Sequence, residues 1–99
     1  GDYEIAAGWH CYLEDHLSFP FKARCTTERT TSPLKRGEVV EVMNIADQND
    51  CLHEMFVIIR FMDRRLGVPL TQLEPMDADE ETAEAVGDWR YWFGRGYGH

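Results

Sequence analysis

A change of hydrophobic period at Phe19-Pro20-Phe21 constrains the fold of this 99-residue chain more than any other feature. Before this tripeptide, apolar residues recur at every fourth position: Ile5, Trp9, Leu13 and Leu17. That spacing predicts an amphipathic helix over residues 3–17, and the helix must end before Pro20 because proline disfavours helical geometry in the preceding residue. From Phe21 the period becomes two, which is typical of a half-buried strand. The chain therefore belongs to the α+β class.

Short strands separated by polar turns are expected from about residue 21 to residue 73. Residues 38–45 are rich in β-branched side chains. Residues 55–62 are almost continuously apolar, which predicts a strand that is buried on both faces or lies at a barrel core. The charged residues 63–65 form a turn into a short strand over 66–70. This order is typical of a small SH3-like β-barrel, although another small barrel would show the same periodicity.

A second helix is expected over about residues 78–93, giving a barrel flanked by an N-terminal and a C-terminal helix. The acids at Asp77 and Glu80 form a capping pattern at its start. An apolar stripe at helical spacing follows: Ala85, Val86, Trp89, Trp92 and Phe93. We expect the two terminal helices to pack together over the barrel; the alternative is an aromatic binding face. The length and composition fit one domain over residues 1–99.

The charge of the chain limits its partners. Eighteen acids against ten dispersed bases give a formal charge of −8, which disfavours nucleic acid and anionic membranes and favours cations or basic proteins. The longest apolar stretch, residues 55–59, is far below the roughly 18 residues that span a bilayer. Three cysteines without CxxC spacing fit a reducing compartment, so a cytoplasmic location is expected.

The distribution of acids is the most informative feature for function. Seven of the 18 acids lie between Glu74 and Asp88, and no Lys or Arg occurs from Leu66 through Trp89. Concentrated carboxylates without a compensating base favour a hard divalent cation, and Ca²⁺ fits best because it accepts 6–8 oxygens in flexible geometry. Helix capping and solubility explain the same acids without a metal, and the EF-hand spacing is absent.

Catalysis is not expected. Ser18 and Ser32 lack a nucleophile-elbow motif, and no pair of carboxylates stands out as a hydrolytic dyad. Cys51 lies beside acidic residues, which should raise its pKa and reduce its reactivity. His16 is expected to be a half-buried helix residue, and the cysteines small core residues.

Four segments resemble the small calcium-binding protein family first recognised in cyanobacteria, whose type member is a cytosolic calcium buffer. They run from Leu17 to Ala23, from Ser32 to Gly37, from Val68 to Leu73 and from Asp88 to Tyr97. The resemblance covers nearly the whole chain, and its Phe-Pro-Phe-x-Ala, Val-Pro-Leu-x-Gln-Leu and Asp-Trp-x-Tyr-Trp strings are unusual in combination. It implies an acidic α+β protein that binds Ca²⁺ through carboxylates, as a buffer or modulator.

The resemblance also points to the oxygen-rich segments before Cys51 and ahead of the last helix as the ligands. The expected ligands are Asp47, Asp50, Asp77, Asp79 and Glu80, with Asp63 and Asp88 in reserve. The alternative function is a metal-independent protein-interaction module that uses the barrel loops at residues 26–37 and 47–53. Whether Ca²⁺ or Mg²⁺ is preferred depends on cavity size and ligand count, which the sequence leaves open.

Overall fold

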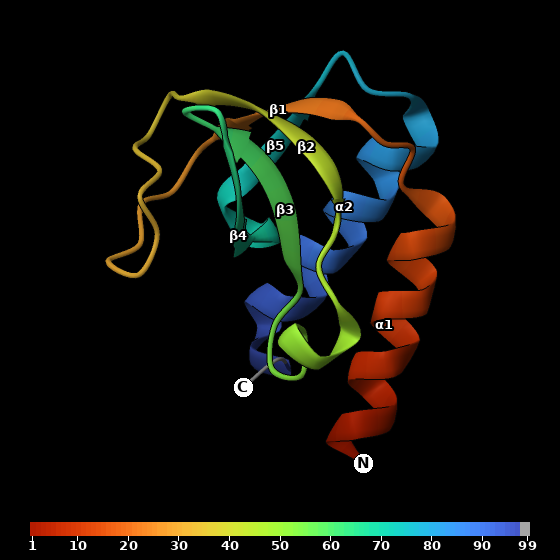
Figure 1. Cartoon of the computed structure of the whole chain (residues 1–99). Coiled ribbons are helices and arrows are strands. Elements are labelled where there is room, and N and C mark those ends of the chain that lie inside the picture. The colour runs from red at the N-terminus through yellow and green to blue at the C-terminus, as the bar shows by residue number, and fades with distance from the viewer. Residues whose placement is uncertain (98–99) are drawn as a thin grey trace.

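The computed structural model describes residues 1–97; the last two residues of the expected domain lie outside the described part. Helix α1 (Asp2–His16) leads into a five-stranded antiparallel sheet, and helix α2 closes the chain (Figure 1). The remaining elements are β1 (Phe21–Cys25), β2 (Val39–Ile45), β3 (Phe56–Phe61), β4 (Arg64–Pro69), β5 (Leu73–Met76) and α2 (Glu80–Trp92). The predicted α+β class is confirmed.

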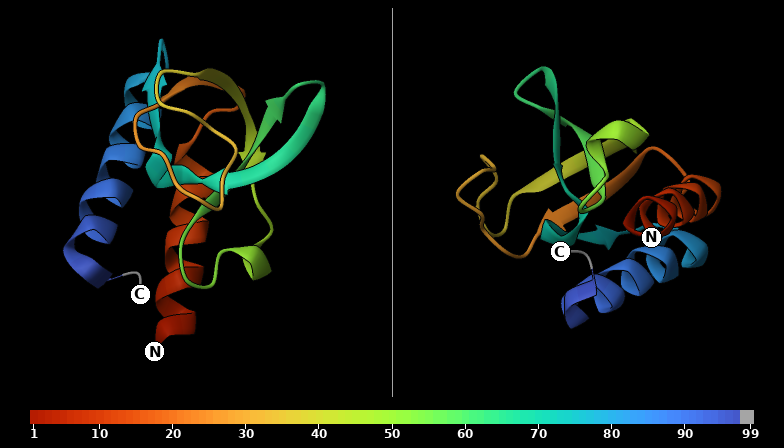
Figure 2. Two further views of the ribbon diagram at one scale, coloured as in Figure 1. Left: turned by 90° about the vertical axis from the view of Figure 1, so that its left-hand side faces the viewer. Right: turned by 90° about the horizontal axis from the view of Figure 1, so that it is seen from below.

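The sheet has the strand order β4-β3-β2-β1-β5 and is strongly curved (Figures 1 and 2). A single 3₁₀ turn, η2 (Leu70–Gln72), joins the two edge strands β4 and β5. In β2, the extra residue Met43 shifts the register between Val42, which pairs with Ile59, and Asn44, which pairs with Ile58. Such bulges increase local bending. These features make the SH3-like arrangement that the order of strands and turns predicted.

The two helices lie side by side and antiparallel, and together they cover one side of the sheet (Figures 1 and 2). At one end of the pair, the backbone N–H of Ser18 donates to Thr82 Oγ1 over 2.9 Å. Farther along, the Trp9 ring lies 5.3 Å from Trp89 and 5.5 Å from Trp92, centroid to centroid. The predicted packing of the terminal helices is therefore confirmed. Neither helix of the described residues has the length and apolarity needed to cross a bilayer.

One cluster of buried apolar side chains draws on both helices and every strand. Strand β1 alternates between buried and exposed side chains as predicted. Strand β3 does not bury both faces: Val57 and Ile59 are fully buried, whereas Phe56 and Ile58 are only partly so. Of the two predicted environments, the strand has the second: one face lies in the core, and the other face is partly exposed.

The β3–β4 turn also differs from the prediction. It consists of Met62 and Asp63, with φ angles of 51° and 62°, while Arg64 and Arg65 already belong to β4. Two successive residues at positive φ are typical of the type I′ turns that match the twist of a two-residue hairpin. The Met62 side chain is 77% exposed at this tip.

The buried stripe of α1 is offset from the predicted one. Ala6, His10 and Leu13 are buried, whereas Ile5 is 46% exposed. Nε2 of His10 lies 2.8 Å from the carbonyl oxygen of Ala46, so a histidine ties the helix to the chain leaving β2. Periodicity missed His10 because it counts only apolar residues, although an imidazole with a hydrogen-bond partner is readily buried.

Trp89 is the largest fully buried side chain, in contact distance of Trp9, Trp92 and Phe93. Replacing it with alanine (Trp89→Ala) should lower the free energy of unfolding by about 3–5 kcal/mol, because a large cavity opens between helices and sheet. Tyr91→Ala is the matched control: Tyr91 belongs to the same helix and is 68% exposed, so its loss should change stability by only about 0.5 kcal/mol. Urea unfolding followed by circular dichroism measures both, and equal losses would contradict this account.

Candidate metal-binding region

The structure places the expected ligands in three separate regions. Asp47 and Asp50 flank the 3₁₀ turn η1 (Gln48–Asp50), whereas Asp77, Asp79 and Glu80 lie where α2 begins. The first region follows Ala46, whose carbonyl oxygen contacts His10 in the middle of α1. The second region adjoins Thr82, whose hydroxyl contacts Ser18 just after the end of α1. His10 is six residues, or about 9 Å, from the end of α1 at His16, and Ser18 lies beyond that end. The two acidic segments therefore sit at opposite ends of the helix pair and do not converge (Figure 1).

Asp63 lies in the third region, the tip of the β3–β4 hairpin. The surface hollow there is lined by Asp63 together with Arg60, Arg64 and Arg65. Three guanidinium groups around one carboxylate oppose the approach of a cation. Asp63 is thus the expected ligand with the least favourable surroundings.

At the start of α2, the helix cap lies two residues later than predicted. Asp77 has a φ of 53° and precedes the helix, and the cap is Asp79, whose Oδ1 accepts from the backbone N–H of Thr82 over 2.7 Å. Hydrogen bonds from the side chain and backbone of Thr82, and from the side chain of Ser18, lower the pKa of the Asp79 carboxyl. Asp79 therefore has a structural role whether or not it binds a metal.

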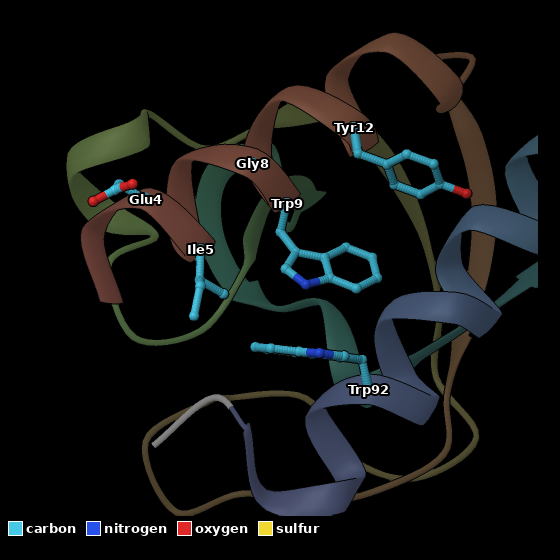
Figure 3. A pocket seen from close by; sticks show the side chains of 6 residues that line it. All are labelled: Glu4, Ile5, Gly8, Trp9, Tyr12 and Trp92. Atoms are coloured by element: carbon cyan, nitrogen blue, oxygen red, sulfur yellow. The ribbon is translucent and has the colours of Figure 1, made fainter. Parts of the chain in front are cut away.

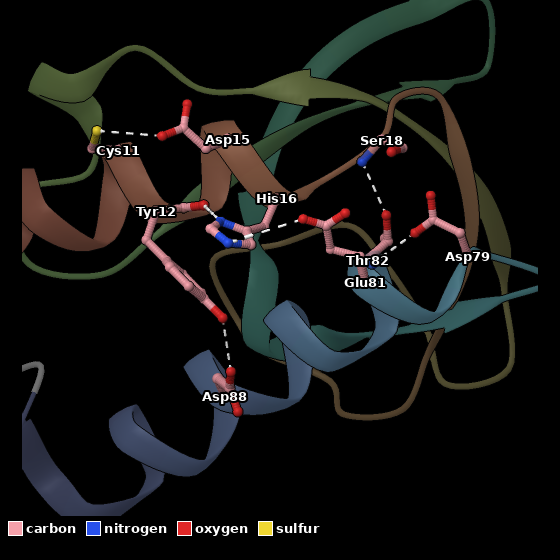
Figure 4. A network of polar contacts seen from close by, with 9 residues as sticks. All are labelled: Cys11, Tyr12, Asp15, His16, Ser18, Asp79, Glu81, Thr82 and Asp88. Carbon is pink, nitrogen blue, oxygen red and sulfur yellow. Dashed lines mark hydrogen bonds and ion pairs between the residues drawn. The ribbon is translucent and has the colours of Figure 1, made fainter.

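The described residues form an acidic cleft of about 370 Å³ between the end of α1 and the first half of α2. It is lined by Tyr12, His16, Glu80, Glu81 and Glu84. No Lys or Arg is among the described residues that line it. Nε2 of His16 lies 4.0 Å from Glu81 Oε2, and Nδ1 of His16 lies 2.7 Å from the Tyr12 carbonyl oxygen (Figure 4).

Asp88 extends this acidic cleft along α2. Its Oδ2 accepts a hydrogen bond of 2.9 Å from the Tyr12 hydroxyl (Figure 4). That hydrogen bond is the main reason why the pKa of Tyr12 is raised, with smaller contributions from burial and from the negative charges of Asp88, Glu84 and Glu81. The raised pKa of Tyr12 thus reflects chiefly its hydrogen bond to Asp88.

Sequence reasoning included Glu80 and Asp88 among the ligands but missed Glu81 and Glu84. The available signal was their spacing: residues 81, 84 and 88 follow an i, i+3, i+7 pattern, which places them on one face of a helix. That face meets Tyr12 and His16 of α1 only because the two helices pair antiparallel, which periodicity does not reveal.

The donors fit a hard cation better than a soft one. All the acids of the cleft offer carboxylate oxygens, the ligands that Ca²⁺ and Mg²⁺ prefer. Among the described residues, however, no three His, Cys, Asp or Glu side chains are arranged to share one ion. The cleft is therefore an open, acidic surface and not a preformed cage.

The Cys51 thiol has little reactivity because it is buried and its pKa is raised. Burial is the main cause that raises the pKa of Cys51, and the charges of Asp50 and Asp47 raise it further. The direction predicted from the acidic loop is confirmed, although desolvation outweighs the acids. Cys25 and Cys51 are core residues as expected, whereas Cys11 is exposed. His16 is half-buried as predicted.

The fold and its acidic cleft define a small acidic α+β protein with carboxylates exposed between two helices. A family model for CcbP, described as "Calcium binding", matches residues 1–93, so the chain belongs to this calcium-binding protein family. The description names calcium binding and no catalytic activity. A comparison with curated proteins gave no match.

Two solved structures are similar over nearly the whole chain. The crystal structure of Anabaena CcbP is 34% identical with a TM-score of 0.85, and the match covers 100% of this chain and 81% of that one. A structure described as a calcium-binding protein in the calcium-binding form is 34% identical with a TM-score of 0.86, covering 98% of this chain and 80% of that one.

Removing the cap with Asp79→Ala should lower the melting temperature at pH 7. Asp79→Ser should lower it much less, because a serine hydroxyl also accepts a hydrogen bond at an N-cap. The pKa of Asp79 is lower in the folded than in the unfolded chain. Its stabilisation is therefore fully present above the unfolded pKa of about 3.9 and is lost as the pH falls through the folded pKa. Thermal unfolding between pH 7 and pH 2 should show the Asp79→Ala deficit shrinking over this acidic range. A deficit that is independent of pH would refute the assigned role of the carboxylate.

Asp88→Asn should lower the pKa of Tyr12 towards the ordinary tyrosine value of about 10, because the carboxylate that disfavours the phenolate is gone. Nuclear magnetic resonance titration of the Tyr12 ring between pH 8 and pH 12 measures this shift. Asp15→Asn, which removes an acid of α1 that contacts Cys11 instead, should leave the Tyr12 pKa in place. If the pKa of Tyr12 is the same in Asp88→Asn as in the unchanged protein, the hydrogen bond between Tyr12 and Asp88 is refuted.

Proposed function

We propose that this chain binds Ca²⁺ through surface carboxylates and acts as a calcium buffer or modulator. The observation that carries the proposal is the acidic cleft between α1 and α2, whose carboxylates lack a neighbouring Lys or Arg among the described residues. Membership of a family described by calcium binding supports it, as does the 34% identity to a protein whose structure is described as a calcium-binding form.

The physical argument is electrostatic. Glu80, Glu81 and Glu84 follow one another within five residues and share a cleft, so their charges repel each other in the absence of a cation. A divalent ion relieves this repulsion, and binding to the folded chain alone stabilises the fold. Ca²⁺ suits an open cleft because it tolerates irregular geometry and completes its 6–8 oxygens with water, whereas Mg²⁺ demands a near-ideal octahedron.

We assign the ligands to two regions. The first is the acidic cleft with the acids at the start of α2, which contains four of the expected ligands: Asp77, Asp79, Glu80 and Asp88. The second is the η1 turn with Asp47 and Asp50. One carboxylate of each region already has a local role, since Asp79 caps α2 and Asp47 Oδ1 accepts from the Asn49 backbone N–H over 2.9 Å. Asp63, among its arginines, is the weakest member of the proposed set.

A cytosolic location and the absence of catalysis complete the proposal. The raised pKa of Cys51 supports a chain without a thiol nucleophile. Two buried free cysteines, Cys25 and Cys51, fit a reducing compartment. The alternative, an interaction module that works without metal through the barrel loops, predicts a partner whose binding is insensitive to chelator.

The test is a Ca²⁺ titration of chelator-stripped protein, followed by amide chemical shifts and melting temperature. At a Ca²⁺ concentration about 100 times the Kd, binding adds about 2.7 kcal/mol, which is a rise on the order of 10 °C for a chain of this size. We expect saturable shifts in residues 77–88 and in the η1 turn, with a smaller response to Mg²⁺. The absence of shifts at millimolar Ca²⁺ would reject the function.

Variants separate the two regions. The double change Glu81→Gln with Glu84→Gln should remove the response of the cleft, and Asp47→Asn with Asp50→Asn that of the turn. Asp79→Ser retains the helix cap while it removes the carboxylate, so it distinguishes a ligand from a cap. Glu14→Gln with Asp15→Asn removes two acids of α1 that do not line the cleft and serves as the control. A Ca²⁺ response unaffected by either double change would show that the assigned ligands are wrong.

A further inference from the structure

A second concavity continues the acidic cleft along the same helix pair. It is a groove of about 530 Å³ between α1 and the end of α2. Figure 3 shows its lining residues, among them the rings of Trp9 and Trp92, which pack against each other with their centroids 5.5 Å apart. The lining comprises Glu4, Ile5, Gly8, Trp9, Tyr12 and Trp92. We call this concavity the seam groove.

The seam groove and the acidic cleft share Tyr12, so they form one continuous surface. On α1 this surface runs from Glu4 to His16, thirteen residues or about 18 Å of helix. On α2 it follows residues 81, 84, 88 and 92, which share one helical face. One end of the surface is apolar, with Ile5 and the two tryptophans, and the other end is acidic.

No Lys or Arg is among the described residues that line the two concavities, although Arg90 lies on α2 between Asp88 and Trp92. Residues 1–21 and 66–89 contain no Lys or Arg. The carboxylates along the surface therefore select an occupant of positive charge, while the apolar end selects hydrophobic side chains. A second copy of this chain would bring the same carboxylates and another formal charge of −8.

The α1 wall of the seam groove includes Gly8, which has no side chain to occupy the groove. A Cβ added to Gly8 would meet nothing within 4 Å, so packing inside the protein does not require glycine there. Glycine is also among the poorest helix formers, and this one lies within α1. Its absence of a side chain lets another backbone approach the helix closely.

We propose that the surface formed by the seam groove and the acidic cleft docks a basic amphipathic helix of a partner protein. The apolar side chains of that helix enter beside Ile5 and Trp9, and its Lys or Arg side chains lie along Glu81, Glu84 and Asp88. A helix suits the site because two antiparallel helices already form its walls, and apolar anchors spaced at i, i+3 and i+4 fit a groove between helices. This interaction surface lies on the helices and not on the barrel loops, and it does not require bound calcium.

The probe is a synthetic peptide of about 14 residues, or about 20 Å of helix, with leucine on one face and lysine on the other. Its binding is measured by fluorescence anisotropy in chelator at physiological salt. One comparison peptide has serine in place of leucine, and another has glutamate in place of lysine. We expect the leucine–lysine peptide to bind at least about tenfold more tightly than either, with shifts at Ile5, Gly8 and Trp9. Equal binding of the serine–lysine peptide would show attraction by charge alone and overturn the proposal.

Gly8→Phe places a ring on the α1 wall of the groove, where an added Cβ meets nothing within 4 Å, and should weaken binding of the leucine–lysine peptide about tenfold or more. Gly87→Phe is the matched control, because Gly87 is an exposed glycine within α2 that has equal free space and does not line the groove. Circular dichroism melts confirm that both variants fold. If both variants weaken peptide binding equally, or if neither weakens it, the assigned site is wrong. Self-association in sedimentation experiments that Gly8→Phe abolishes would identify a second copy as the occupant and reject a partner helix.

Discussion

The burial of Trp89 between α1, the sheet and its own helix is the interaction on which the rest of the structure depends. Its ring contacts Trp9 on one side and the aromatic end of α2 on the other, with Val86 and Ala85 buried a turn earlier. This contact sets the rotation of α2 about its axis. Once the face with Trp89 points inward, helical geometry turns residues 81, 84 and 88 towards the edge where α1 passes. The acidic cleft is thus a consequence of core packing.

The same geometry explains why the carboxylates remain an open surface. Each is anchored on a helix and points outward, so each keeps much of its hydration, and the fold does not have to bury uncompensated charge. A closed calcium cage needs ligands from a loop that wraps around the ion. Here the loop acids have other roles: Asp79 caps a helix, Asp47 closes a turn and Asp63 lies among arginines. Two of the acids that the sequence suggested as ligands, Asp47 and Asp79, therefore also stabilise the local backbone.

The helices and strands could largely be predicted from the sequence, but which side chains meet in the folded protein could not. Period and turn chemistry identified both helices, the alternating strand β1 and the strand order of an SH3-like fold, because these depend on neighbours along the chain. The exact residues of the Met62–Asp63 turn and the partial exposure of the outer face of β3 were not predicted, because both depend on the packing of neighbouring strands. The ligand set needed distances between residues far apart in sequence. Nothing in the spacing of Asp47 and Asp77 reveals that α1 separates them, or that Tyr12 would meet Asp88.

Tyr12 connects the two proposed activities. It borders both the acidic cleft and the seam groove, and its hydroxyl is held by Asp88. A cation in the cleft and the basic side chains of a docked helix would draw on the same carboxylates, Glu81 and Glu84 foremost. Two ligands that compete for the same charges are negatively coupled, and that coupling must be reciprocal: each weakens the other by the same factor. A small acidic chain with both properties would release its basic partner as Ca²⁺ rises. The modulator role then follows from the shared carboxylates, without any change in the fold.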